Sequence, residues 1–204
     1  MNPPRVTIAS VVEGEGEMSA LPVLLRRLMG EAQIWDADIK RPLRRDRGQL
    51  ARPGGLEAAV EAQARRVPAD NLGGILVMID AADDCPASVG PSLLARAEAA
   101  RPDRRTAVVL ANREFEAWFL ASAPSLSGRA GLAEHLEVPA NSETLRDCKG
   151  RLTHHRRDGV RYRPRVDQAA LTDVIDLDLA RANSSSFNKF CRDITYLVTG
   201  KRGE

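Results

Sequence analysis

The most informative residues of this chain are Val11-Val12-Glu13-Gly14-Glu15-Gly16-Glu17 and Ile75-Leu76-Val77-Met78-Ile79-Asp80-Ala81-Ala82-Asp83-Asp84. Each stretch is an apolar run of strand length that ends abruptly in carboxylates. In open α/β sheets, ligands collect at the carboxyl ends of the parallel strands. We therefore expect the two acidic endings to meet at one edge of a sheet.

The hydrophobic pattern around these stretches predicts alternating strands and helices. Strands are expected at residues 5–12, 34–39, 73–79 and 105–110, and helices at residues 18–29, 56–67, 91–100 and 113–121. Such alternation is typical of a mostly parallel sheet with helices on both faces. The predicted fold class is therefore α/β.

The pattern weakens after residue 123, which suggests a domain at residues 1–123 and a mixed C-terminal extension at residues 124–204 packed on it. Within the extension we expect a short helix at 132–136, an irregular basic stretch at 149–165, a helical or mixed segment at 167–180 and a terminal helix at 186–197. Residues 40–55 are basic and rich in helix breakers, so they are expected to form a loop.

Composition excludes several classes of protein. The chain has 204 residues, 43% of them hydrophobic, which suffices for a core, and its net charge of +2 gives no overall nucleic-acid signal. No apolar run approaches the roughly 20 residues of a membrane span. The first residues do not resemble a signal peptide, and the three cysteines form no CxxC pair. We expect a cytoplasmic protein with no membrane partner.

The acidic residues suggest a metal site. Glu13 and Asp80 directly follow apolar runs, where a carboxylate is costly without a partner. Crowded carboxylates are relieved by hard cations such as Mg²⁺. The alternatives are structural: Glu17 as a helix N-terminal carboxylate, Asp83 and Asp84 as the start of a turn, and Glu116 as an exposed helix start.

A resemblance to known families extends this interpretation. The glutamate after the first strand and the aspartates after a later one resemble the Toprim motif of topoisomerases, primases and nucleases of the overcoming-lysogenization-defect type. More closely, Val12–Glu17, Ile79–Pro86, Ala111–Ala121 and Arg181–Phe187 resemble a bacterial family numbered 4276 among the domains of unknown function. That family is Toprim-like and suspected of a part in phage defence.

The resemblance implies roles for individual residues. Glu13 takes the place of the general acid or base, and Asp80 and Asp84 take the outer places of the metal-binding triplet, giving the catalytic set. The middle place is Ala82, for which Asp83 is a candidate substitute. The implied cofactor is Mg²⁺ or Mn²⁺, and the candidate ligands are Glu13, Asp80, Asp83, Asp84 and Glu116.

Two arginine-rich segments suggest contact with nucleic acid. Arginine neutralises phosphates without reading sequence, and Tyr162 lies between arginines where it is a candidate for stacking on a base. The alternative is a solvated arginine-rich surface. The candidate nucleic-acid-binding residues are Arg44, Arg45, Arg47, Arg156, Arg157, Arg161 and Arg163.

These features lead to a first functional expectation and two alternatives. The first is a Mg²⁺-dependent Toprim-type nuclease or phosphodiesterase that acts on nucleic acid, with a role in phage defence. The second is a non-catalytic or partner-activated subunit of a defence module that contains an ATPase, since the chain has no nucleotide-hydrolysis motif. The third is a hydrolase of small phosphate compounds.

Overall fold

A five-stranded parallel sheet forms the centre of the protein in the computed structural model, which describes residues 5–202. Strand β1 (Val6–Val12) pairs on one side with the short strands β2 (Asp38–Ile39) and β3 (Leu43–Arg44), and on the other with β4 (Leu72–Asp80). Strand β5 (Thr106–Ala111) then pairs with β4. All these pairings are parallel, which confirms the predicted α/β class.

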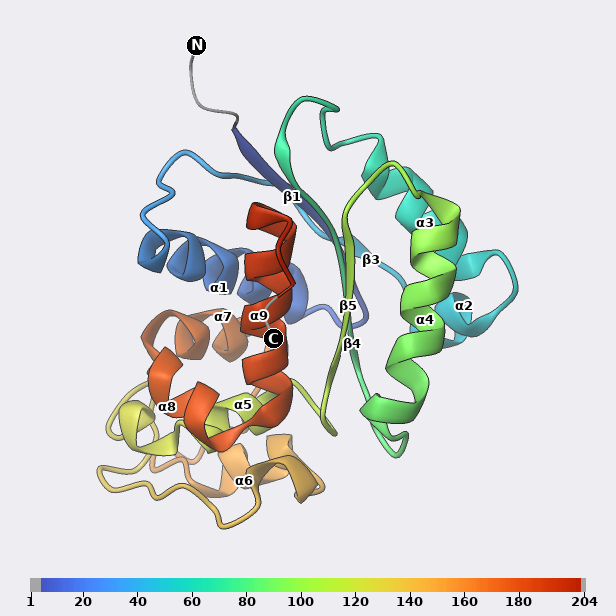
Figure 1. Ribbon diagram of the computed structural model, residues 1–204. Coiled ribbons are helices and arrows are strands. Elements are labelled where there is room, and N and C mark those ends of the chain that lie inside the picture. The colour runs from blue at the N-terminus through green and yellow to red at the C-terminus, as the bar shows by residue number, and fades with distance from the viewer. Residues whose placement is uncertain (1–4, 203–204) are drawn as a thin grey trace.

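Helices cover both faces of the sheet (Figure 1). Helices α1 (Glu17–Glu31) and α9 (Ser185–Thr199) lie on one face, and α3 (Gly55–Ala64) and α4 (Pro86–Ala100) lie on the other. The short helix α2 (Arg47–Ala51) lies beside α3. The predicted arrangement, a sheet between two helical layers, is therefore confirmed.

Strand β4 contributes to the cores on both faces. Because successive side chains of a strand point to opposite sides, Leu76 and Met78 enter the core beneath α1 and α9, and Ile75 and Val77 enter the core beneath α3 and α4. A strand covered on both faces reads as a continuous apolar run. The same alternation directs Asp80, two residues after Met78, toward the α1 and α9 side.

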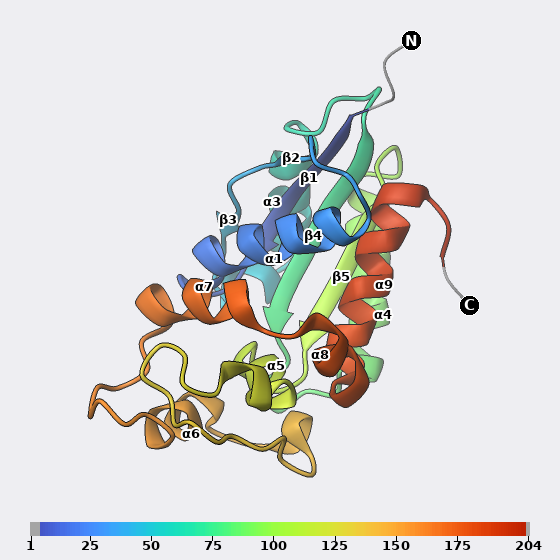
Figure 2. The same cartoon turned by 90° about the vertical axis from the view of Figure 1, so that its left-hand side faces the viewer.

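The rest of the chain gathers beyond the carboxyl ends of the strands (Figure 2). It consists of α5 (Glu116–Ala121), the 3₁₀ turns η1 (Ala123–Leu126) and η2 (Ser142–Thr144), and the helices α6 (Cys148–His154), α7 (Pro164–Val174) and α8 (Leu177–Asn183). Helix α9 then returns along the sheet and contacts β4 and β5.

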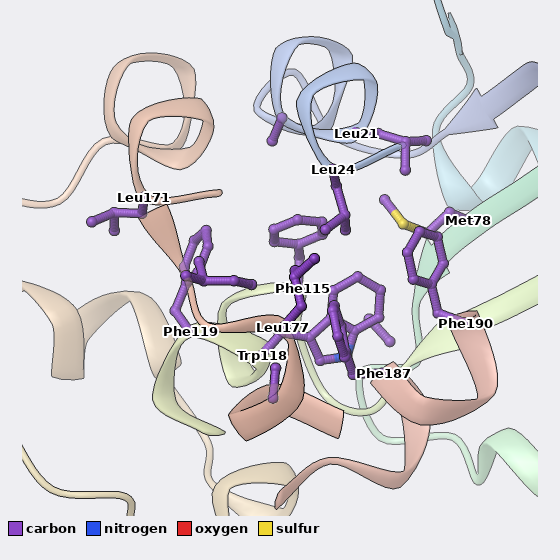
Figure 3. Packing of buried hydrophobic residues seen from close by; sticks show 14 of the residues in the cluster. Leu21, Leu24, Met78, Phe115, Trp118, Phe119, Leu171, Leu177, Phe187 and Phe190 are labelled. Atoms are coloured by element: carbon purple, nitrogen blue, oxygen red, sulfur yellow. The ribbon is translucent and has the colours of Figure 1, made fainter. Parts of the chain in front are cut away.

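Aromatic side chains join the C-terminal residues to the sheet (Figure 3). Phe115 and Trp118, whose ring centroids are 4.8 Å apart, belong to the segment that follows β5. The Trp118 ring lies 5.2 Å from that of Phe187 and 5.3 Å from that of Phe190, both in α9. These rings are fully buried in one core together with residues of α1 and β4.

Several predicted elements are wrong or misplaced. Residues 40–55 are not simply a loop, because they contain β3 and α2, and α2 begins with a capping box in which Asp46 and Gln49 each accept a hydrogen bond from the other's backbone. The basic stretch 149–165 likewise contains most of α6. Both elements are too short for the hydrophobic period to show them.

The predicted helix at 132–136 is absent from the described chain, because its backbone pairs elsewhere: the Ala133 N–H donates to the His155 carbonyl at 2.9 Å. Helix α4 begins five residues earlier than predicted, with Pro86 in its first turn, where a proline is tolerated. Helix α5 begins at Glu116 because Arg113 has a left-handed backbone, with φ of 66°.

Candidate functional site at the carboxyl edge of the sheet

A cleft of about 320 Å³ opens where β1, β4 and β5 end. It brings together three of the predicted acidic residues, Glu13, Asp80 and Asp83, from the ends of β1 and β4, and one predicted nucleic-acid-binding residue, Arg47. Asp84 and Glu116, also predicted, are not among the residues that line it. The lining residues are Glu13, Arg47, Asp80, Ala82, Asp83, Arg113, Glu114, Arg146 and Asp147.

The surroundings of Asp80 perturb its carboxylate strongly. Its Oδ1 accepts a hydrogen bond from the Phe115 N–H at 2.8 Å, which fixes the orientation of the group. Burial raises the pKa of Asp80 well above its usual range, and the charges of Glu116 and Glu17 raise it further, against the opposing effect of Lys149. Asp80 therefore favours either a proton or an additional cation.

Glu13 has an oxygen without a partner. Burial raises the pKa of its carboxyl group, while Arg47 and the backbone of Asp80 lower it. Its Oε2 atom is buried, and no donor within residues 5–202 reaches it. Because an unpaired buried polar atom is unfavourable, this oxygen is available to a ligand.

Near Asp80, an ionic cluster holds the buried Glu116. The Tyr162 hydroxyl donates to Glu116 Oε1 at 3.0 Å, and the Lys149 ammonium lies 3.0 Å from Oε2 and 2.9 Å from the Glu114 carboxylate. As a metal ligand, Glu116 would have to give up one of these partners. The predicted stacking of Tyr162 on a base is wrong, since its side chain is buried and bonded to Glu116.

Glu17 stabilises the loop that follows β1. Its Oε2 accepts from the Gly14 N–H at 2.5 Å and its Oε1 from the Gln168 amide at 3.2 Å. The interpretation of Glu17 as a helix N-terminal carboxylate is therefore confirmed. Gly16 allows the approach of α7, because a Cβ at that position would lie 1.8 Å from Gln168 Oε1.

Arg47 binds the end of β4 and the turn that follows it. Its Nη1 donates to the carbonyls of Asp80 at 2.7 Å and Ala81 at 3.0 Å, and its Nη2 pairs with the Asp84 carboxylate. Asp84, carried over as a metal ligand from the resemblance, would have to leave Arg47 to fill that role. Arg47, predicted to bind nucleic acid, is in the structure bound to the protein's own β4–α4 turn.

Two further arginines meet at Asp83. Arg113 Nη1 and Arg146 Nη2 lie 2.6 Å and 2.8 Å from the same oxygen, Asp83 Oδ1. Ala82 and Arg113 both have left-handed backbones, with φ of 51° and 66°. The Ala82 N–H donates to the Arg113 carbonyl and Arg113 Nη1 to the Ala82 carbonyl, both at 3.0 Å, so the strained turns after β4 and β5 fix each other.

The two arginine-rich segments approach each other at Glu15, which lies 3.7 Å from Arg44 and 3.0 Å from Arg165. Of the predicted nucleic-acid contacts, Arg156 is only 9% exposed and pairs with Asp158 and Asp167. The remaining predicted contacts lie on the surface: Arg44, Arg45, Arg157, Arg161 and Arg163.

The donor set fits a cation shared with a substrate rather than one enclosed by protein. No three His, Cys, Asp or Glu side chains within the described residues form a group that could hold a metal ion. Asp80 and Glu13 do supply two carboxylates in one cleft, and Mg²⁺ commonly takes one or two carboxylates plus water and substrate phosphate oxygens. The predicted Mg²⁺ or Mn²⁺ stays a prediction.

Sequence reasoning missed Lys149, Arg113 and Arg146, because each pairs with acids that are distant in the chain. The structure also shows, within the residues it describes, no helix long and apolar enough to cross a membrane.

Comparison with known proteins gives a family but no relative of known function. Neither the curated proteins nor the solved structures contain a significant match. A family model, described as a domain of unknown function (DUF4276), matches residues 12–195. The match runs from Val12, the last residue of β1, through most of α9 and includes every lining residue of the cleft. The chain belongs to the DUF4276 family.

Proposed function

We propose that this protein is a metal-dependent phosphodiesterase that cleaves nucleic acid in the cleft at the carboxyl ends of β1 and β4. One observation carries the proposal: Glu13 and Asp80 converge in an open cleft, and burial raises the pKa of both carboxyl groups. Perturbed carboxylates that share a cleft are typical of catalytic and metal-binding sites.

Asp80 is the proposed principal ligand for Mg²⁺ or Mn²⁺, and the free oxygen of Glu13 is the second donor available. When bound, the cation would polarise the scissile phosphate and stabilise its developing charge. The Phe115 N–H keeps the Asp80 carboxylate in position. Hydrolysis joins a water oxygen to the phosphorus as the P–O bond to the leaving oxygen breaks, and Glu13, whose pKa is raised, would take the proton of that water or give a proton to the leaving oxygen.

The exposed arginines of the two basic segments are the proposed contacts to the nucleic-acid backbone. Lys and Arg bind phosphates largely irrespective of sequence. Because both segments approach Glu15 in the loop after β1, they flank the side of the cleft that Glu13 occupies. This arrangement suits a chain of phosphates that runs past the site.

The proposal is tested with supercoiled plasmid, single-stranded DNA and RNA in Mg²⁺, Mn²⁺ or EDTA. Asp80→Asn keeps an oxygen that accepts from the Phe115 N–H but removes the charge, so we expect cleavage to fall about 100-fold or more. Asp70→Asn is the matched control, an exposed aspartate before the amino end of β4. Equal cleavage by the two variants, both folded by circular dichroism, would contradict the proposal.

A second candidate is a partner-activated subunit of a defence module that contains an ATPase. It is favoured by the ion pairs of the cleft, where Asp83 and Asp84 are both held by arginines. Activation would then require a partner to open these pairs. Purified protein that cleaves only after the product of an adjacent ATPase gene is added would support this candidate, and cleavage by the protein alone would exclude it.

A further inference from the structure

The contact of Arg113 and Arg146 with Asp83 has the features of an occupied anion site. Two guanidinium groups converge on one carboxylate oxygen, at 2.6 Å and 2.8 Å. The Asp83 and Arg146 side chains are 71% and 72% exposed, and exposed ion pairs of this kind are weak. Asp83 is therefore readily displaced by a better-matched anion.

The charges at this contact do not balance. Among the described residues, Asp83 is the one carboxylate that pairs with the two guanidinium groups, while Glu114 and Asp147 line the same cleft without an ion pair to either. A phosphate monoester carries about −1.5 to −2 at pH 7 and offers three strong acceptor oxygens. It therefore matches the pair of arginines in both charge and number of acceptors better than a carboxylate or a phosphodiester does.

The fold fixes the Arg113 guanidinium and the backbone beside Arg146. The Arg113 guanidinium also donates to the Ala82 carbonyl at 3.0 Å, and the Arg113 backbone is fixed by the Ala82 N–H. Arg146 directly precedes Asp147, whose carboxylate accepts from the Gly150 N–H at the start of α6. Both arginines line the same cleft as Asp80 and Glu13.

We propose that Arg113 and Arg146 form a binding site for a terminal phosphate monoester of the substrate, and that Asp83 occupies this site until the substrate displaces it. The inference deepens the proposed function, since it names a group that the substrate carries next to the scissile bond. It also assigns Asp83 a role opposite to that of a metal ligand: a mimic of the phosphate that competes with it.

The test measures binding in EDTA, so that its outcome does not depend on a metal or on cleavage. The probes are inorganic phosphate, studied by calorimetry, and one labelled pentanucleotide with either phosphate or hydroxyl groups at both ends. The wild-type protein is expected to bind the pentanucleotide with phosphate ends more tightly than the same pentanucleotide with hydroxyl ends. Equal affinity for the two pentanucleotides would show that terminal phosphate is not recognised and would overturn the proposal.

The direction in which each variant changes phosphate affinity distinguishes this role of Asp83 from metal binding. Arg113→Gln and Arg146→Gln should each weaken phosphate binding about tenfold or more, because each removes a charged hydrogen bond. Asp83→Asn should tighten it by about three- to fivefold, since the competing charge is gone. The control is Asp70→Asn, which changes net charge equally. An Asp83→Asn effect no larger than that of the control would refute the inference.

Failure of this proposal and failure of the proposed function are distinguishable. If Asp80→Asn abolishes metal-dependent cleavage but the arginine variants bind phosphate normally, only the phosphate site is refuted. If no metal-dependent cleavage is found but phosphate binding follows the expected order of variants, the anion site stands and the cleavage activity does not. Thermal unfolding of each variant verifies that the fold is intact.

Discussion

Ala82 adopts a backbone conformation that alanine disfavours. Its φ of 51° lies in the left-handed region, which costs a residue with a Cβ roughly 1–2 kcal/mol. The strain is held by the hydrogen bonds between Ala82 and Arg113. Strained residues gather at functional sites, where the surrounding structure maintains them, and this pair lies at the mouth of the cleft.

Ala82→Gly should therefore stabilise the protein. Relief of the strain outweighs the added freedom of glycine in the unfolded chain, and we expect a gain of about 0.5–1 kcal/mol in the free energy of unfolding. Urea denaturation measures it. The matched control is Ala95→Gly on the exposed side of α4, where the backbone is helical and a loss of about 0.5–1 kcal/mol is expected. Losses in both variants would contradict the account.

Sequence patterns reveal acids that directly follow apolar runs, and little else of the site. Glu13 and Asp80 were predictable because a carboxylate at the end of a buried strand needs a partner. Lys149 was not, because its partners Glu114 and Glu116 are distant in sequence. A pairing made by the fold leaves no local pattern, so contacts of this kind can be found only in the structure.

At the scale of elements, the start of α9 depends on one acidic side chain. Glu143, in η2, accepts hydrogen bonds from the Ser184 hydroxyl at 2.8 Å and the Ser186 N–H at 2.8 Å. It also accepts from the N–H and hydroxyl of Ser185, at 3.0 Å and 2.6 Å. Burial raises the pKa of Glu143, but these hydrogen bonds outweigh it, and the pKa is lowered overall.

Glu143→Gln should destabilise the protein at pH 7 by about 1–2 kcal/mol. All four partners are donors, so the amide nitrogen of glutamine leaves at least one of them unpaired. The pKa of Glu143 is lower in the folded than in the unfolded protein. Its contribution to the free energy of unfolding is therefore complete above the unfolded pKa of 4.5 and is lost as pH falls through the folded pKa.

The measurement is chemical denaturation of wild type and variant between pH 7 and pH 3. The difference in unfolding free energy should shrink below about pH 4.5. Glu137→Gln, at an exposed position in the same irregular region, is the control and should show little change. A difference that stays constant down to pH 3 would show that the charge of Glu143 is not responsible.

How well an element is predicted follows its length and its burial. The long apolar runs gave β1, β4 and β5 to within one or two residues, and the helical period gave α1, α3 and α9 closely. The short helices α2 and α6 were not predicted, because capping and tertiary contacts stabilise them and they show no hydrophobic period. The extra turn of α4 was missed because Pro86 marks a helix start as readily as a loop.

For the whole molecule, the open prediction is the boundary at residue 123. The structure places Phe187 and Phe190 of the C-terminal extension in the same core as Trp118. The extension also supplies Lys149 and Tyr162, the partners of Glu116 near Asp80. A boundary that divides both the core and the site does not separate units able to fold alone.

We therefore expect the full chain to unfold in one cooperative transition and the fragment 1–123 to remain unfolded. Without α9, the fragment would expose the faces of β4 and β5 that α9 covers. Circular dichroism during urea denaturation tests this for both chains. Phe190→Ala in the full chain should cost about 3–5 kcal/mol and still give a single transition.

A sigmoidal transition from the fragment alone would contradict this expectation and show that residues 1–123 fold without the extension. The same fragment also bears on the site, since it retains Glu13, Asp80 and Glu116 but lacks Lys149 and Tyr162. If it folds, Glu116 loses both the Lys149 charge and the Tyr162 hydroxyl with which it is paired. The acidic cleft therefore requires the C-terminal extension for its charge balance as well as for its core.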